Sequence, residues 1–268
     1  MTFFCCGRGP APDPAVPRGF PRGVVLLAIL VFLCVITSCF SNNAPDRTYF
    51  SIDYALGQQP SYSCAKFDRS VMIQNASSII AYDRQEIVYR ANPYEFQYYW
   101  YRLWASKPRK MLRELIASHL RYTNLFRSVS LTVEDRLPDY ALEVEITSIE
   151  EMDVSEKEWY AHLGLRFTLV HLETNANVWT YEFDARRPVA DNKPVYVVKA
   201  MSELLDAELV KAFRDLDETL SRKERAVPGC VARVLPAEGA EAAPAEVPAQ
   251  AAQDGEPDAP RATLRNGR

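Results

Sequence analysis

The stretch that decides the fold is YALEVEITSI, residues 140–149. Its apolar and polar side chains alternate, which is typical of a β-strand with one buried and one solvated face. Two further apolar runs, 159–172 and 178–184, flank the polar segment ETNAN at 173–177. They predict a β-hairpin directly after the first strand, and consecutive strands joined by short turns indicate an antiparallel arrangement.

Two segments around these strands have helical spacing. From Lys107 onward, apolar side chains recur every three or four residues, with Ser106 as the candidate N-cap and Pro108 in the first turn. The apolar residues of this helix are Met111, Leu112, Leu115, Ile116 and Leu120. A longer stripe follows the hairpin and consists of Met201, Leu204, Leu205, Leu209, Ala212, Phe213, Leu216 and Leu220. Both segments predict amphipathic helices that bury one face.

Shorter strands are expected at 49–54, 71–73, 86–90 and 128–133. The elements therefore follow one another as strands, helix, strands and helix. This order predicts an α+β fold, in which two main amphipathic helices pack against a mostly antiparallel sheet. The folded domain is expected to cover residues 48–235.

The two ends of the chain differ from this domain in composition. Residues 236–268 are rich in Pro, Ala and Glu and contain no aromatic residue. They cannot bury enough apolar surface to offset the entropy lost on ordering, so we expect a disordered tail. Residues 39–47 are expected to form a short polar tether, and residues 1–38 a signal peptide.

The signal peptide is indicated by the uncharged apolar run at 24–36. Its length of about 13 residues suits an export signal, whereas a membrane-spanning helix needs about 20. The run ends in ITSC at 36–39, which resembles the lipobox of bacterial lipoproteins, in which Cys39 accepts the lipid. The alternative is an uncleaved signal anchor with a chance cysteine at its end. Since Phe40 rather than Asp follows the cysteine, this resemblance implies the outer membrane, with the domain in the periplasm.

The charge of the chain argues against one class of partner. The formal net charge is −4, and the predicted signal peptide carries three arginines and one aspartate, a net +2, so its loss leaves −6. Nucleic-acid binding needs clustered Lys and Arg that neutralise phosphates. The same balance argues against attachment to anionic lipids through a polybasic segment.

The sequence contains no recognisable catalytic or cofactor motif. Gly164 is the only glycine between Gly57 and Gly229, which excludes a glycine-rich phosphate loop there. The three histidines are His119, His162 and His171. None of them has the spacing of a metal ligand. Glu143 and Glu145 share one strand face and are expected at the solvated surface rather than as an acid/base pair. We therefore predict that the protein is not an enzyme and has no catalytic, cofactor or metal site.

Two cysteines remain in the mature chain besides Cys39. They are Cys64 and Cys230. In an oxidising compartment they can pair, which would close a long loop between the segment after the first strand and the end of the last helix. The alternative is two independent small apolar residues, because the sequence does not place their Cα atoms.

The most unusual segment is PYEFQYYWYRLWA at 93–105, which contains seven aromatic residues. Aromatic residues are enriched at protein contact sites. The candidate partner-contact residues are Tyr98, Tyr99, Trp100, Tyr101 and Trp104. The alternative is that half of these aromatics face the core of the sheet and half line the corner between strand and helix.

Five motifs occur in order along residues 48–222. They are YFSID at 49–53, DRQEIVYR at 83–90, YYWYRLWA at 98–105, the helix from Pro108 and DYALE at 139–143. Each motif alone has little specificity. Together they resemble the ABC-type transport auxiliary lipoprotein family, which includes the paraquat-inducible protein C-like lipoproteins.

The resemblance implies a docking role and names its partners. Members of this family work with an ABC permease and ATPase and with a periplasmic substrate-binding protein of the mammalian-cell-entry type, and these systems move lipids between two membranes. The lipoprotein would give the conduit a fixed point on the outer membrane, with a homo-oligomeric ring as one arrangement, and no cofactor is implied. Two alternatives remain: an assembly or pilot subunit of another outer-membrane complex, and an envelope hydrolase with inconspicuous catalytic residues.

Overall fold

The computed structural model describes Gly23 and residues 45–56, 60–133, 136–155, 158–191 and 193–234. The described residues from Arg47 onward belong to one compact unit. The predicted signal peptide, Cys39 and the C-terminal tail lie outside the described residues, apart from Gly23, as does most of the predicted tether.

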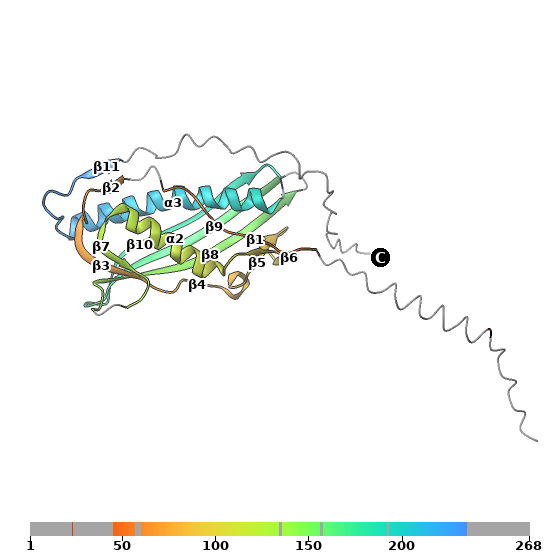
Figure 1. The fold of residues 1–268 in the computed structure, drawn as a ribbon, viewed down its shortest axis with the longest axis horizontal. Coiled ribbons are helices and arrows are strands. Elements are labelled where there is room, and N and C mark those ends of the chain that lie inside the picture. Colours follow the sequence, from red (N-terminus) through yellow and green to blue (C-terminus); the bar gives the residue numbers. More distant parts are fainter. Residues whose placement is uncertain are drawn as a thin grey trace, which may run out of the picture. The chain divides into compact units, whose positions relative to one another are not determined.

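The unit contains short strands first, then a helix, four further strands, a long helix and a last short strand (Figure 1). In chain order the elements are β1 (Thr48–Phe50), β2 (Pro60–Tyr62), β3 (Phe67–Ile73), β4 (Ser77–Ser78), the 3-10 helix η1 (Ile80–Tyr82), β5 (Glu86–Arg90), β6 (Gln97–Trp104), α2 (Pro108–Thr123), β7 (Phe126–Ser130), β8 (Tyr140–Ser155), β9 (Glu158–His171), β10 (Ala176–Val189), α3 (Pro194–Lys223) and β11 (Ala232–Val234).

Three long antiparallel strands form one side of the sheet, with β10 at its edge. Strand β9 pairs with β8 on one side and with β10 on the other, so the hairpin expected after residue 149 is confirmed. Between residues 161 and 169, every second residue of β9 is fully buried: Ala161, Leu163, Leu165, Phe167 and Leu169 are each 0% exposed. Helix α3 packs against β9 and β10. Burial of this continuous apolar face is the main driving force for the fold.

Gly164 lies on β9 beside an irregularity in its pairing with β8. The register of β8 shifts between Ile146 and Ser148, and Ser148 is the partner of Gly164. A Cβ atom at this glycine would lie 2.4 Å from the Thr147 Oγ1 atom and 2.6 Å from the Ser148 Oγ atom. No side chain larger than hydrogen fits without displacement of these hydroxyls.

Short strands line the other edge of β8 and extend the sheet in two directions. β3, β4 and β5 each pair with β8 in parallel, near its beginning, its middle and its end. β7 continues the sheet from β3, while β6 and then β1 continue it from β5, which gives the order β1-β6-β5-β8-β3-β7. The α+β class is confirmed. The longest ladders are antiparallel, and the parallel pairs of the short strands make the sheet mixed.

Both helices lie on one face of the sheet (Figure 1). The predicted apolar stripes are buried: Leu112, Ile116 and Leu120 of α2 are 0% exposed, as are Met201 and Leu205 of α3. The cap prediction was wrong, because Lys107 rather than Ser106 is the N-cap of α2 and makes no side-chain hydrogen bond. Pro108 at the first helical position has no N–H that needs a partner, so the helix begins without a capping side chain.

The first predicted strand is shorter than expected. It ends at Phe50 rather than at residue 54, because the next backbone donors bond to the helices instead of to a strand. The Ile52 N–H donates to the Met111 sulfur, and the Asp53 N–H donates to the Ser202 hydroxyl at 3.2 Å. The segment after β1 therefore leaves the sheet and crosses over α2 and α3.

Candidate functional site

Most of the aromatic segment forms strand β6, and its aromatic side chains divide into a buried set and an exposed set. Trp104 is 1% exposed and belongs to the core. Tyr99 also points inward: its hydroxyl donates to the Glu151 carboxylate at 3.0 Å, and its ring centroid lies 4.5 Å from that of Tyr89. Burial raises the pKa of Tyr99, and the nearby Glu151 carboxylate raises it further. The phenol is therefore a fixed hydrogen-bond donor within the fold.

These positions correct the predicted contact surface. Trp104 cannot contact a partner, because the hydrophobic core surrounds it, and Tyr99 is held inward by Glu151. Tyr98 is partly buried, with the Arg84 guanidinium 3.7 Å above its ring. Trp100 and Tyr101 remain accessible, with 79% and 39% of their surfaces exposed. The segment therefore contributes to both the core and the surface.

The exposed aromatics extend beyond β6 to neighbouring elements. The large aromatic side chains that are exposed among the described residues are Tyr49, Tyr94, Phe96, Trp100, Tyr101 and Tyr196. We call this set the aromatic end. Its most exposed member is Tyr94, at 91%, in the turn between β5 and β6. Monomeric soluble proteins rarely expose large contiguous apolar patches without a binding role.

The sheet topology places these residues at one end of the unit. β1 runs parallel to β6 with Thr48 beside Arg102, two residues from Trp100. The turn that carries Tyr94 follows Arg90, which is the partner of Met152 near the end of β8. β10 ends and α3 begins at this same end, where β1, β5 and β6 also lie (Figure 1). Three chain segments far apart in sequence thus contribute exposed aromatic residues to one end of the unit.

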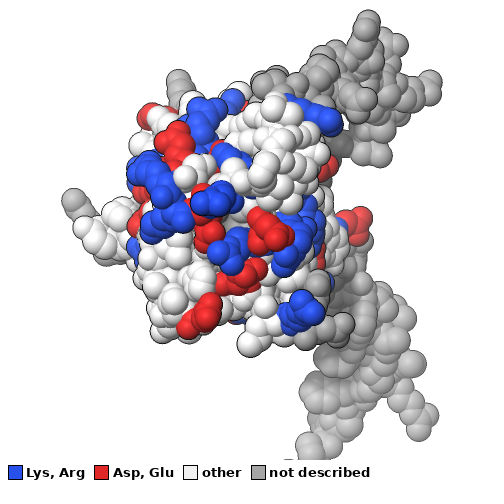
Figure 2. Space-filling model, turned by 90° about the vertical axis from the view of Figure 1, so that its left-hand side faces the viewer, with Lys and Arg blue, Asp and Glu red and all other residues white. Residues whose placement is uncertain are grey.

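The opposite end of the unit is charged. Figure 2 shows Lys and Arg side chains interspersed with Asp and Glu side chains over this face. Many of these charges are paired with one another. Lys66 pairs with Asp217 at 2.5 Å, and Arg127 with Asp68 at 2.6 Å.

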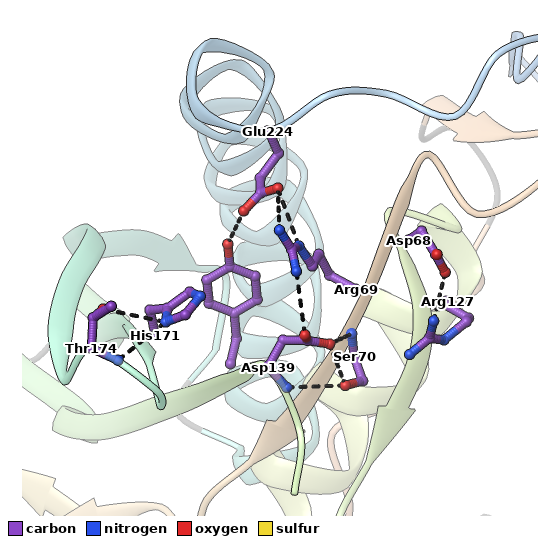
Figure 3. Close-up of polar contacts among 9 residues, drawn as sticks. Asp68, Arg69, Ser70, Arg127, Asp139, His171, Thr174 and Glu224 are labelled. Atoms are coloured by element: carbon purple, nitrogen blue, oxygen red, sulfur yellow. Dashed lines mark hydrogen bonds and ion pairs between the residues drawn. The ribbon is translucent and has the colours of Figure 1, made fainter. Parts of the chain in front are cut away.

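Arg69 is the centre of a polar network at the charged end (Figure 3). Its guanidinium lies 3.0 Å from the Glu224 carboxylate at the end of α3 and 3.5 Å from Asp139. Tyr140 donates its hydroxyl proton to Glu224 at 2.5 Å. Burial alone would raise the pKa of Glu224, but the hydrogen bonds from Tyr140 and Arg69 outweigh it, so the pKa lies below its ordinary value. The pKa of Asp139 also lies below its ordinary value, because the Ser70 N–H and the Ser70 hydroxyl both donate hydrogen bonds to this carboxylate.

The chain after α3 folds back across this end. Strand β11 pairs with β2, and the Val227 N–H donates to the Lys66 carbonyl at 2.8 Å. Cys64 and Cys230 are joined by a disulfide, with their Cα atoms 5.4 Å apart. Few side chains of residues 225–233 are buried, so the disulfide and the backbone hydrogen bonds are what hold this segment.

A buried polar cluster lies on the face of the sheet opposite the helices. Its centre is Glu150, 1% exposed, which accepts hydrogen bonds from the Tyr82 hydroxyl at 2.7 Å and from Arg90 at 3.4 Å. The His162 Nδ1 atom lies 3.0 Å from the same carboxylate, while its Nε2 atom contacts Asp184. Burial would raise the pKa of Glu150, but the hydrogen bonds from His162 and Tyr82 and the charge of Arg90 lower it overall.

The sequence contained one signal for this cluster. Glu150 and Glu151 are consecutive residues of one strand, so they point to opposite faces of the sheet. A sheet with helices on one face must then bury at least one of them, and here both are buried, at 1% and 0% exposure. Glu143 is exposed as expected, and Glu145 is ion-paired with Arg166 at 2.7 Å on the outer face.

The polar clusters are arranged to hold segments together. Within the described residues, no group of three or more His, Cys, Asp or Glu side chains is placed to hold a metal ion. Among these residues, no helix combines the length and the apolar character needed to cross a bilayer. The aromatic end is the described surface whose composition most clearly suggests a contact.

Comparison with known proteins gives one family match. A model described as "ABC-type transport auxiliary lipoprotein component" matches residues 36–211. This range contains Cys39, β1 to β10 and the first half of α3. Comparison with curated protein sequences gives no match.

Solved structures share the fold. A protein from Xanthomonas campestris superposes with a TM-score of 0.58 at 18% sequence identity, over 66% of this chain and 98% of its own. A second, uncharacterised protein gives a TM-score of 0.51 at 13% identity, over 64% of this chain and 99% of its own. At these identities the likeness concerns the fold alone.

Proposed function

Because the chain belongs to the ABC-type transport auxiliary lipoprotein family, we propose that it is the lipid-anchored docking subunit of an ABC-type system that moves lipids between the two membranes of the envelope. The observation that carries the proposal is the family match, which begins just before Cys39 and continues into α3. The lipobox at 36–39 supplies the attachment point. The outer membrane would carry the lipid, and the domain would face the periplasm.

The construction of the domain supports a role through contact. Its polar clusters tie strands and helices to one another, as Arg69 does for Asp139 and Glu224. Such networks give a rigid body rather than a reaction centre. A rigid body on a lipid anchor keeps its binding surface at a high local concentration beside the membrane, which strengthens weak contacts without new interactions.

The proposed partners are the periplasmic substrate-binding protein of the mammalian-cell-entry type and the ABC permease and ATPase. A ring of several copies of this chain would surround the conduit. These partners come from the family resemblance, and the aromatic and charged ends are the described surfaces through which contacts could form.

Co-purification tests the proposal. The tagged full-length chain is isolated from native membranes in mild detergent, and the recovered proteins are identified by mass spectrometry. We expect the permease, the ATPase and the mammalian-cell-entry protein. Recovery of a different outer-membrane assembly in their place would refute the transport role and support the assembly or pilot alternative.

The lipid anchor is tested on the same material. Intact-mass measurement should show a chain that begins at Cys39 and carries acyl groups, and the control variant Cys39→Ser should keep its signal peptide. An unmodified thiol at Cys39 in the native protein would remove the basis of the docking role.

A further inference from the structure

We propose that the aromatic end lies in the headgroup region of the same bilayer that holds the lipid on Cys39. The folded domain then contacts the membrane through Trp100, Tyr101 and their neighbours. This inference rests on the lipid anchor of the proposed function. It adds a second, non-covalent membrane contact made by the folded domain itself.

The chemistry of the exposed side chains favours a membrane interface. Four of the six residues of the aromatic end are tyrosines and one is Trp100. These two residue types concentrate at headgroup level, where the ring meets an apolar medium and the O–H or N–H group meets a wet one. The large exposed apolar residues of the charged end, such as Leu137 and Leu172, are by contrast aliphatic.

The length of the tether places this end near the membrane. The nine residues from Cys39 to Thr48 span at most about 30 Å. Thr48 pairs with Arg102, next to Tyr101. The charged end lies farther away by the length of β8, whose 16 residues extend about 50 Å. The tether therefore holds the aromatic end, and not the charged end, close to the lipid headgroups.

The charges around this end indicate what kind of contact it makes. Arg187 is paired with Glu203 at 2.7 Å, and Lys193 with Asp191 at 3.4 Å. These two paired cations gain little from anionic lipids. The contact should therefore depend on the aromatic rings and change little with salt or with the fraction of anionic lipid.

Trp100 provides a built-in reporter for this contact. The full-length lipidated chain is reconstituted into vesicles of phosphatidylethanolamine and phosphatidylglycerol, with or without bromine on the acyl chains. Bromine quenches only tryptophans that reach the bilayer. Subtraction of the Trp100→Phe variant isolates the Trp100 signal from the signals of the other three tryptophans. Trp104 and Trp179 are 1% and 5% exposed, and Trp159 is partly buried.

We expect brominated vesicles to remove most of the Trp100 signal, with the same result at low and high salt. The double variant Tyr94→Glu/Tyr196→Glu should restore much of it. The matched control Val133→Glu/Leu137→Glu alters residues that are 59% and 81% exposed near the charged end, and it should leave the quenching unchanged.

Two results would overturn the inference. Equal Trp100 emission in both kinds of vesicle would show that the aromatic end does not touch the bilayer. Emission that stays unquenched in vesicles but becomes shielded in the co-purified complex would assign this surface to a protein partner. Intact mass of the same sample separates the two proposals: an unlipidated chain refutes the anchor, whereas a lipidated but unquenched chain refutes only the membrane contact.

Discussion

Acidification should destabilise the protein through one buried histidine, His119. This residue lies on α2, is 0% exposed and packs against the ring of Phe213 at a centroid distance of 5.2 Å. Its Nδ1 atom lies 3.0 Å from the Tyr54 hydroxyl. Burial lowers the pKa of His119 to about 3.

The direction of the effect follows from this lowered pKa. The folded state binds the proton of His119 only at about pH 3, whereas the unfolded chain binds it at about pH 6.5. The unfolded state therefore holds more protons below pH 6.5, and the free energy of unfolding falls as the pH falls. Between pH 7 and pH 5 this single group removes about 2 kcal/mol, at about 1.4 kcal/mol per pH unit below 6.5.

Urea unfolding of the wild type and of His119→Gln at pH 7, 6 and 5 measures this contribution. Glutamine keeps a polar group beside Tyr54 but does not titrate, so the variant should lose about 2 kcal/mol less than the wild type over this range. His171→Gln, at a partly exposed position, serves as the control for the loss of a histidine. The buried carboxylates contribute little, because unfolded Asp and Glu have pKa values of about 4. Parallel pH dependences for the wild type and His119→Gln would refute the reasoning.

Three further predictions concern the construction of the domain. Gly164→Ala should lower the free energy of unfolding by about 1–3 kcal/mol, because its Cβ would overlap the neighbouring hydroxyls; unchanged urea stability would contradict this. The disulfide between Cys64 and Cys230, which are 166 residues apart, should contribute up to about 5 kcal/mol to the free energy of unfolding. Urea unfolding with and without reductant measures this contribution. The Cys64→Ser/Cys230→Ser variant should not respond to reductant, and two titratable thiols in the native wild type would argue against the bond. Glu150→Ala should lower the free energy of unfolding by about 3–5 kcal/mol, because Tyr82 and the other buried partners of Glu150 lose their hydrogen-bond acceptor. The exposed control Glu143→Ala should change the free energy of unfolding by no more than about 0.5 kcal/mol.

The central architecture could be predicted because its signals are local. Alternation at 140–149 and helical spacing after Lys107 each depend on side chains a few residues apart, and one buried face is enough to produce them. The same reasoning predicted too short a strand, because it ended β8 at residue 149. Residues 150–155 continue the strand, but Glu150 and Glu151 are both buried there, and alternation of apolar and polar residues cannot reveal a strand buried on both faces.

The parallel pairings could not be predicted for a different reason. Whether β3, β4 and β5 lie beside β8 depends on contacts between residues about 60 to 70 positions apart, such as Val71 with Tyr140 and Tyr89 with Glu151. Nothing local in the sequence specifies such partners. The aromatic segment shows the same limit: its composition marked it as unusual, but only the position of β6 between β1 and β5 separates the buried Trp104 from the exposed Trp100.

The two ends of the domain imply how a partner would be bound. If the aromatic end stands on the membrane, the charged end faces away from it and meets the partner first. Many of its cations are already paired, as Arg69 is with Asp139 and Glu224, so a partner must compete with existing ion pairs and gains little from each such contact. A single domain should then bind weakly. Strong capture would require several copies anchored on one surface, where the second and later contacts form at high effective concentration. Capture of the partner by vesicles should consequently rise more steeply than linearly with the density of the lipoprotein, and a strictly linear dependence would indicate that one copy is sufficient.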